Sequence, residues 1–186
     1  MELEKALSGL GSSDSSDSGV TARIIGSILY WMEEKKSQSF IVGTANDVSK
    51  LPPELLRKGR WDELWYVDLP TEPERKDIFR IHITKTGRDI KKFKSLQDFA
   101  KASDGFTGAE IAACVRTAMF SAFYEDREFT EKDIISAIKD TIPLTKMKGE
   151  EITALREWAR YRAKFANDIG KDVYKKTTKN SKVILN

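Results

Sequence analysis

Cysteines and long apolar runs are nearly missing from this chain of 186 residues, and each absence excludes a class of protein. Cys114 is the only cysteine, so no disulfide can form within the chain, and a fold held by disulfides is excluded. No run approaches about 18 consecutive apolar residues, so the sequence predicts no membrane span. The first residues also lack the basic and then apolar order of a secretion signal.

A strong excess of one charge is missing as well. The net charge is +3, although a third of the residues are charged and 40% are hydrophobic. This balance is typical of a globular protein of one ordinary domain or two small ones. It does not by itself argue for nucleic-acid binding.

Two apolar runs frame the stretch around which the chain is organised. Residues 40–45, FIVGTA, are rich in β-branched and apolar side chains and predict a buried strand. Asn46 and Asp47 follow with side chains that favour turns. Residues 64–69, LWYVDL, predict a second strand, which Pro70 stops.

A short helix is expected between these strands. Pro52 and Pro53 open it, because the first helical N–H groups need no partner, and Gly59 closes it with a positive φ. Arg57 and Arg60 are three residues apart and are expected on one side of that helix. One amide and two guanidinium groups would then lie near one sheet edge, where open α/β sheets bind ligands.

The segments TAND and LPPELLRKGRWDE together resemble the second homology region of the AAA ATPases. The resemblance implies that Asn46 is the sensor that touches the γ-phosphate or the attacking water. It also implies that Arg57 and Arg60 are fingers that reach the nucleotide of a neighbouring subunit. The alternative is a strand–turn–strand unit with solvated arginines.

The first residues fit the same resemblance in part. MELEK looks like the end of the site that holds Mg²⁺ and the catalytic glutamate, with Glu2 matching that glutamate and Met1 at the position of the aspartate. A disordered terminal Glu2 is the equal alternative. A loop rich in Ser, Gly and Asp follows, and then a helix for which Thr21 is the expected N-cap.

A phosphate-binding GxxxxGK[ST] motif is missing from these 186 residues. The only Gly-Lys pair is Gly170-Lys171, but Asp172 follows it and Phe165 stands where the first glycine should be. We interpret these residues as part of a larger ATPase, and we expect that they do not hydrolyse ATP by themselves.

Helical signals dominate after Pro70. Thr71 and Glu74 form a capping-box pattern at the start of one helix, and KSLQDFAKAS predicts a second, short helix. Thr107 and Thr130 are expected to cap two further helices. The expected inner face of the first helix consists of Ile78, Phe79, Ile81 and His82. These helices predict a compact bundle.

The segment DGFTGAEI resembles the lid of the AAA ATPases. The resemblance implies that Gly108 and Ala109 bring a helix N-terminus close to the base and ribose. It also implies that His82, the only histidine, contacts the adenosine; the alternative is an ordinary, partly buried histidine. Arg116 is not assigned a sensor role.

Residues 147–168 predict one more helix, whose apolar positions are Ile152, Leu155, Trp158, Ala159 and Phe165. With the preceding PLT and the stretch around Asn46, this segment is similar to a little-studied AAA branch of bacteria, cyanobacteria and plastids. The lysine-rich end from Gly170 predicts a frayed tail, with a nucleic-acid or membrane role as the alternative.

The predicted fold class is α/β plus all-α. Residues 1–70 would be the second half of an α/β nucleotide-binding domain, residues 71–165 a helical lid, and residues 166–186 a basic tail. The resemblance implies ATP and Mg²⁺ as cofactors of the complete protein and other AAA subunits as partners in a homo-oligomeric ring. Neither a membrane nor nucleic acid is an expected partner, and the expected location is the cytoplasm or a plastid stroma. The alternative function is a non-catalytic module that binds ring subunits or another protein through the lid.

Overall fold

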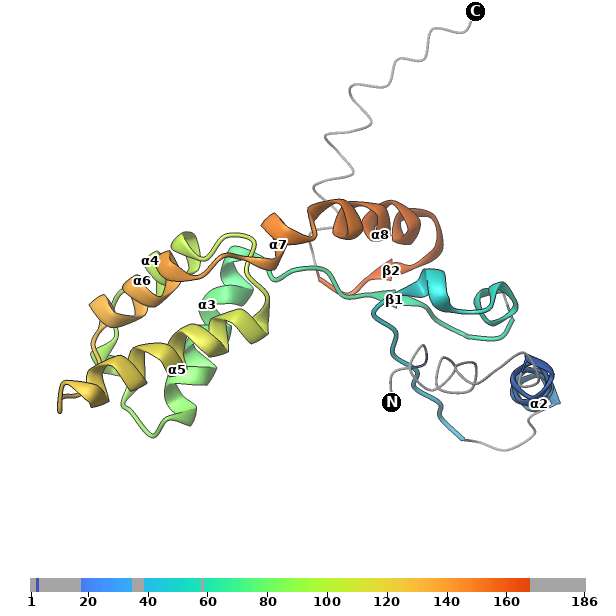
Figure 1. Ribbon diagram of the computed structural model, residues 1–186, viewed down its shortest axis with the longest axis horizontal. Coiled ribbons are helices and arrows are strands. Elements are labelled where there is room, and N and C mark those ends of the chain that lie inside the picture. The colour runs from blue at the N-terminus through green and yellow to red at the C-terminus, as the bar shows by residue number, and fades with distance from the viewer. Residues whose placement is uncertain (1–2, 4–17, 35–38, 58, 168–186) are drawn as a thin grey trace, which may run out of the picture. The chain divides into compact units, whose positions relative to one another are not determined.

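The computed structural model describes residue 3 and residues 18–34, 39–57 and 59–167 (Figure 1). The chain forms two compact units, which span Met1–Leu64 and Trp65–Asn186. Each unit has its own apolar core. Among the described residues, no helix is both long and apolar enough to cross a membrane.

The first unit is built on helix α2, Ser18–Glu34, and two short 3₁₀ helices, η1 at Val48–Lys50 and η2 at Pro53–Leu56. The predicted N-cap at Thr21 is wrong, because the helix already includes Ser18. The helical spacing of the apolar residues does hold. Ile25, Leu29 and Met32 of this helix pack against Leu51 and Leu55, and these side chains form the small core of the unit.

The predicted buried strand at residues 40–45 is not formed as a strand. Among residues 39–45, Thr44 alone makes a bridge, and its carbonyl also accepts a hydrogen bond of 2.7 Å from the N–H of Leu3. Phe40 is 94% exposed and Val42 is 71% exposed. A strand needs a ladder of hydrogen bonds, and none of the described residues 39–45 belongs to such a ladder.

The second unit begins with a small parallel sheet. Strand β1, Trp65–Tyr66, pairs with β2, Lys164–Phe165, and Tyr66 lies opposite Phe165. The expected strand at residues 64–69 is therefore confirmed over its first part. Its partner was not anticipated, because residue 165 was expected on a helix. Helix α8, Gly149–Arg162, ends at the C-cap Ala163, and Phe165 instead packs edge-on against the Tyr66 ring at 5.2 Å.

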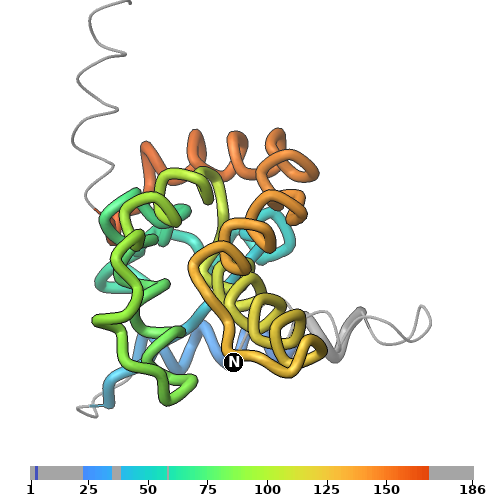
Figure 2. Tube along the Cα trace, turned by 90° about the vertical axis from the view of Figure 1, so that its left-hand side faces the viewer, coloured from blue at the N-terminus to red at the C-terminus, as the bar shows by residue number. Residues whose placement is uncertain are grey.

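Four helices form the bundle that follows: α3, Glu72–Lys85; α4, Leu96–Ala102; α5, Gly108–Tyr124; and α6, Glu131–Asp140. A turn of 3₁₀ helix, η3 at Ile90–Lys92, precedes α4, and the short α7, Leu144–Met147, precedes α8. Figure 2 shows α5 and α6 side by side, as their packing requires. The fold is thus mostly helical with one small parallel sheet, consistent with a truncated α/β part followed by a helical lid.

The predicted caps of the bundle helices are confirmed. Thr71 and Thr107 each complete a capping box with a glutamate three residues later, and Thr130 does so with Asp133. One predicted inward position is wrong, since Ile81 is 49% exposed and Ile83 takes the buried position. The fully buried side chains of the bundle include Phe79, Ile83, Phe99, Ile111, Val115, Ala118 and Ile134.

Candidate functional site

The two candidate finger arginines lie in one turn after η2. Arg57 is the C-cap of that helix, and its N–H donates to the carbonyl of Glu54. The N–H of Arg60 donates in turn to the carbonyl of Arg57, at 3.4 Å. The predicted common side of a helix is wrong, because η2 ends at Leu56 and leaves both arginines outside it. Gly59 does take the expected positive φ, +93°, but within this turn and not as the helix cap.

The side chains of the two arginines have different surroundings. Arg57 is exposed, whereas the side chain of Arg60 is only 20% exposed and forms an ion pair with Glu33 of α2. Trp61 fixes the turn from the other side, because its indole N–H donates to the carbonyl of Leu55 at 2.9 Å. The turn therefore presents one guanidinium to solvent and holds the other against its own unit.

Asn46 lies on a separate bend, just before η1, and its side chain is exposed. The neighbouring Asp47 is the N-cap of η1, and its carboxylate accepts hydrogen bonds from the N–H and hydroxyl of Ser49. Those hydrogen bonds, with the cation of Lys50 at 3.1 Å, lower the pKa of the Asp47 carboxyl. Ser49 and Lys50 therefore hold Asp47, the residue next to Asn46, in the turn.

The lid contributes His82 from α3 and the N-terminus of α5. A Cβ built on Gly108 would meet Ile78 at 3.7 Å, so α3 lies close to the start of α5 there. His82 is one helical turn beyond Ile78 on the same face of α3. The imidazole of His82 is also close enough to α5 for the charge of Arg116 to act on it.

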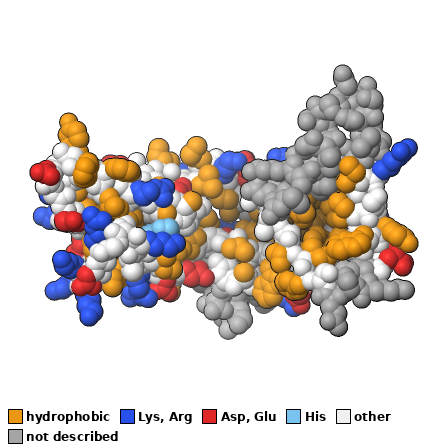
Figure 3. All heavy atoms as spheres, turned by 90° about the horizontal axis from the view of Figure 1, so that it is seen from below, with side chains coloured by type: hydrophobic (Ala, Val, Ile, Leu, Met, Phe, Trp, Pro, Cys, Tyr) orange, Lys and Arg blue, Asp and Glu red, His pale blue; other side chains and the backbone are white. Residues whose placement is uncertain are grey.

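The His82 side chain is partly buried. Burial, followed by the positive charges of Lys85 and Arg116, lowers the pKa of the imidazole below its usual range. Figure 3 shows the histidine with basic side chains beside it on the surface. A neutral imidazole can both donate and accept a hydrogen bond, as contact with a base or a ribose hydroxyl requires.

The N-terminus of α5 is already partly satisfied by its own residues. The carboxylate of Glu110 accepts from the Thr107 N–H at 2.7 Å, and its second oxygen accepts from the Leu144 N–H at 2.7 Å. A carboxylate here takes up the favourable end of the helix dipole and would repel a phosphate. Small Gly108 and exposed Ala109 leave room beside it. This terminus therefore suits an uncharged base or ribose better than phosphate.

Sequence reasoning missed a buried polar cluster beside β1. The side chain of Asp68, 2% exposed, pairs with Arg156 of α8, whose Nε lies 2.9 and 3.0 Å from the two carboxylate oxygens. The amide of Asn167 bonds to the backbone of Asp68 and Leu69. Burial, followed by the charge of Asp68, raises the pKa of Tyr66 to about 12. The hydrogen-bond partners of Asp68 are about 90 to 100 residues away in sequence, so no local sequence pattern could have predicted them.

Three predicted features lie wholly or mostly outside the described residues: Glu2, the loop rich in Ser, Gly and Asp, and the tail at residues 166–186, of which only residues 166 and 167 are described. The described residues contain no group of three or more His, Cys, Asp or Glu that could hold a metal.

Comparison with known proteins identifies the class. Residues 3–69 match the model of the AAA family, ATPases associated with various cellular activities, and residues 95–137 match the AAA+ lid domain. The chain belongs to the AAA ATPases. Membership of this family implies binding of ATP with Mg²⁺, and the family typically forms oligomeric rings.

Similarity to individual curated proteins is more specific than the two family matches. The chain is 42% identical over 159 residues to the uncharacterized AAA domain-containing protein ycf46 of Pyropia yezoensis, and 41% identical over 158 residues to that of Guillardia theta. Each alignment covers 85% of this chain and 32% or 31% of the relative. A Protein SAV of Sulfolobus acidocaldarius is 36% identical over 110 residues, which is 58% of this chain and 14% of that protein. The chain thus spans about a third of the length of the ycf46 relatives.

Proposed function

We propose that this chain supplies the second half of the nucleotide-binding domain and the lid of a ring-forming AAA ATPase. In this proposal residues 1–70 are the α/β part, residues 71–165 the lid and residues 166–186 a basic tail. The observation that carries it is the order of the two family matches, with the AAA model ending at residue 69 and the lid model lying within the helical bundle.

Arg57 and Arg60 would act on the nucleotide of the adjacent subunit. A guanidinium stays charged and offers a planar fork of donors, which suits the charge on a transferring phosphoryl group. Arg57 is exposed and lies outside η2, so it could contact a neighbouring subunit directly. Arg60 must leave Glu33 to reach a neighbour, so the ion pair would hold it back until subunits assemble.

Asn46 would orient the attacking water or contact the γ-phosphate from its bend, and Glu2 would polarise that water. In the lid, His82 would hold the adenosine by hydrogen bonding, with Gly108 and Ala109 permitting close approach of the ribose. ATP with Mg²⁺ supplies the reacting phosphate and its charge neutralisation. The residues of this chain bind, orient and stabilise charge around it.

The test is turnover by the complete ATPase that carries this segment. Arg60→Ala should lower ATP hydrolysis by about 10³-fold or more while nucleotide affinity stays nearly unchanged, because a finger acts on the transition state. Arg23→Ala, which removes an exposed arginine of α2, is the matched control and should leave turnover unchanged.

Mixing then tests action between subunits. Arg60→Ala subunits mixed with subunits disabled at their own phosphate loop should recover part of the activity, since some interfaces then join an intact arginine to an intact site. Full activity of Arg60→Ala alone would contradict the finger role. The 186-residue chain by itself should release no phosphate above background, and release that Asn46→Ala abolishes would overturn that expectation.

A further inference from the structure

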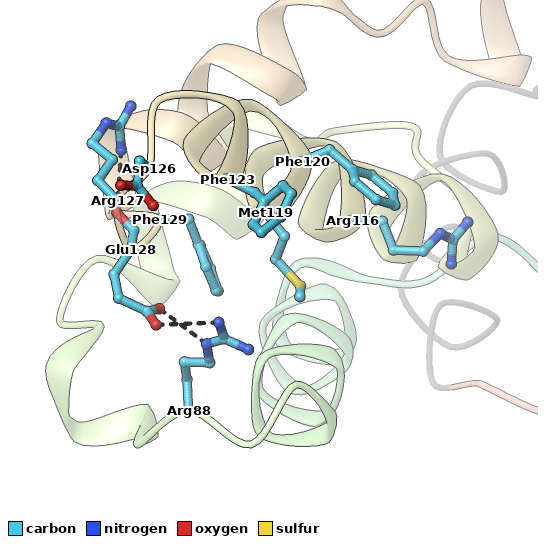
Figure 4. Close-up of a pocket in the computed structure, with 9 residues that line it drawn as sticks. All are labelled: Arg88, Arg116, Met119, Phe120, Phe123, Asp126, Arg127, Glu128 and Phe129. Carbon is cyan, nitrogen blue, oxygen red and sulfur yellow. Dashed lines mark hydrogen bonds and ion pairs between the residues drawn. The ribbon is translucent and has the colours of Figure 1, made fainter.

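A cavity of about 680 Å³ lies at the end of the bundle away from the start of α5. Its apolar lining comes from Met119, Phe120 and Phe123 of α5 and from Phe129. Figure 4 shows Met119, Phe123 and Phe129 bordering one space, with Phe120 beside Arg116. The volume is typical of pockets that take a ligand or a few large side chains.

Helix α5 is apolar on two faces. Ile111, Val115, Ala118 and Ala122 form the inner face, which is buried in the bundle core. The outer face carries Phe120, 70% exposed, and Phe123, 80% exposed. A helix that is apolar on both faces is normally covered on both, and large exposed apolar patches mark interaction sites.

The charges around the cavity are distributed unevenly. Arg88 is held by Glu128 at 3.1 Å, and Arg127 is held by Asp133 at 2.7 Å. The carboxylate of Asp126 also lines the cavity, at the end away from Arg116 (Figure 4). Arg116, at the other end of the cavity, is exposed, and its guanidinium forms no ion pair or hydrogen bond with another described residue. The lowered pKa of His82, caused in part by Lys85 and Arg116, reflects the same positive potential.

We propose that this outer face of α5 is a docking site for an amphipathic helix of a partner protein that carries a carboxylate at its end nearest Arg116. Apolar side chains spaced i, i+4 and i+7 along that helix would enter the cavity, and a carboxylate beside them would pair with Arg116. Aromatic residues and arginine are the residue types that carry most binding energy in such interfaces. The proposal is independent of ATP hydrolysis and gives the interaction role of the lid a defined place.

The experiment measures binding of a fluorescein-labelled helical peptide to the full 186-residue chain by anisotropy. The peptide, about 15 residues long, carries leucines at the stated spacing and glutamates at one end, to lie beside Arg116; a matched peptide carries lysines in place of the glutamates. Phe120→Ala and Arg116→Glu are the test variants. Tyr161→Ala and Lys139→Glu change an exposed aromatic residue and an exposed cation away from the cavity and serve as matched controls.

The glutamate peptide should bind, and each test variant should weaken its binding by about tenfold or more, whereas the controls should not. Arg116→Glu should in addition gain affinity for the lysine peptide. All four substituted side chains are exposed, so thermal unfolding should be unchanged and weaker binding cannot be assigned to misfolding. Equal binding of both peptides, no binding, or no effect of either test variant would overturn the proposal. So would self-association of the wild-type chain that Phe120→Ala abolishes, because the face would then join copies of this chain.

Discussion

The two units of this chain bury apolar side chains to very different extents. In the lid, Phe79, Phe99 and Ile111 are fully buried in one continuous core. In the first unit, Leu51 and Leu55 are the buried members of a small cluster, and Phe40 and Val42 lie open to solvent. Because burial of apolar area is the main favourable term in folding, the lid should hold itself together far better than the first unit.

The largest difference is expected from truncation of one core side chain in each unit. Phe99→Ala should destabilise the lid by about 3–5 kcal/mol, the usual cost of a cavity left by a buried aromatic ring. Leu55→Ala should leave the lid's unfolding transition unchanged. Urea unfolding followed by circular dichroism measures both, and Phe123→Ala, on the exposed face of α5, is the control. A similar loss of lid stability for Leu55→Ala would show that the two cores act as one.

The buried ion pair beside β1 is expected to have the next largest effect. Arg156→Ala leaves the Asp68 carboxylate buried without its strongest partner, which should cost about 1–3 kcal/mol. Arg80→Ala is the control, because the Arg80–Asp77 pair is exposed and should contribute at most about 0.5 kcal/mol. Equal midpoints of urea unfolding for the two variants would contradict a stabilising role for the Asp68 cluster.

Loss of a helix cap should have a smaller effect. Thr107→Ala removes the hydroxyl that accepts from the N–H of Glu110 at 3.2 Å, and a cost of about 1 kcal/mol is expected. Thr107→Ser keeps the hydroxyl and should restore nearly all of the stability. If serine fails as badly as alanine in thermal unfolding, packing of the threonine methyl group, and not capping, is responsible.

The smallest effect concerns pH. Because the folded-state pKa of His82 is lowered below 6.5, the unfolded chain binds the proton more tightly. The contribution of neutral His82 to stability is therefore complete above about pH 6.5 and is lost as the pH falls through the folded-state pKa. His82→Gln should flatten the dependence of the urea midpoint on pH between about 7.5 and 5.5. An unchanged slope would assign that dependence to carboxylates.

Local sequence patterns predicted the helix caps of the lid well, but they did not predict contacts between segments far apart in sequence. The caps at Thr71, Thr107 and Thr130 follow from side chains within three residues, which a sequence displays directly. The pairing of Tyr66 with Phe165 joins segments about 100 residues apart, and Phe165 also fits a helical pattern.

The site was predictable to a similar degree. The motif identified the turn that carries Arg57 and Arg60 and the glycine with positive φ between them. It placed both arginines on a helix that ends earlier, because two prolines and a glycine do not fix the length of a 3₁₀ turn. The ion pair of Arg60 with Glu33 depends on how α2 packs, which no local pattern specifies.

Hydrogen exchange of the intact chain, followed amide by amide, tests the difference between the two units most directly. Amides of α5 between Ala109 and Ala122 should open only with global unfolding of the lid and exchange slowly. Amides of residues 40–44 should exchange rapidly through local opening, because the described backbone there has a single bridge. Equal protection of the two segments in a monomer would contradict the account and would mean that the first unit is as firmly folded as the lid.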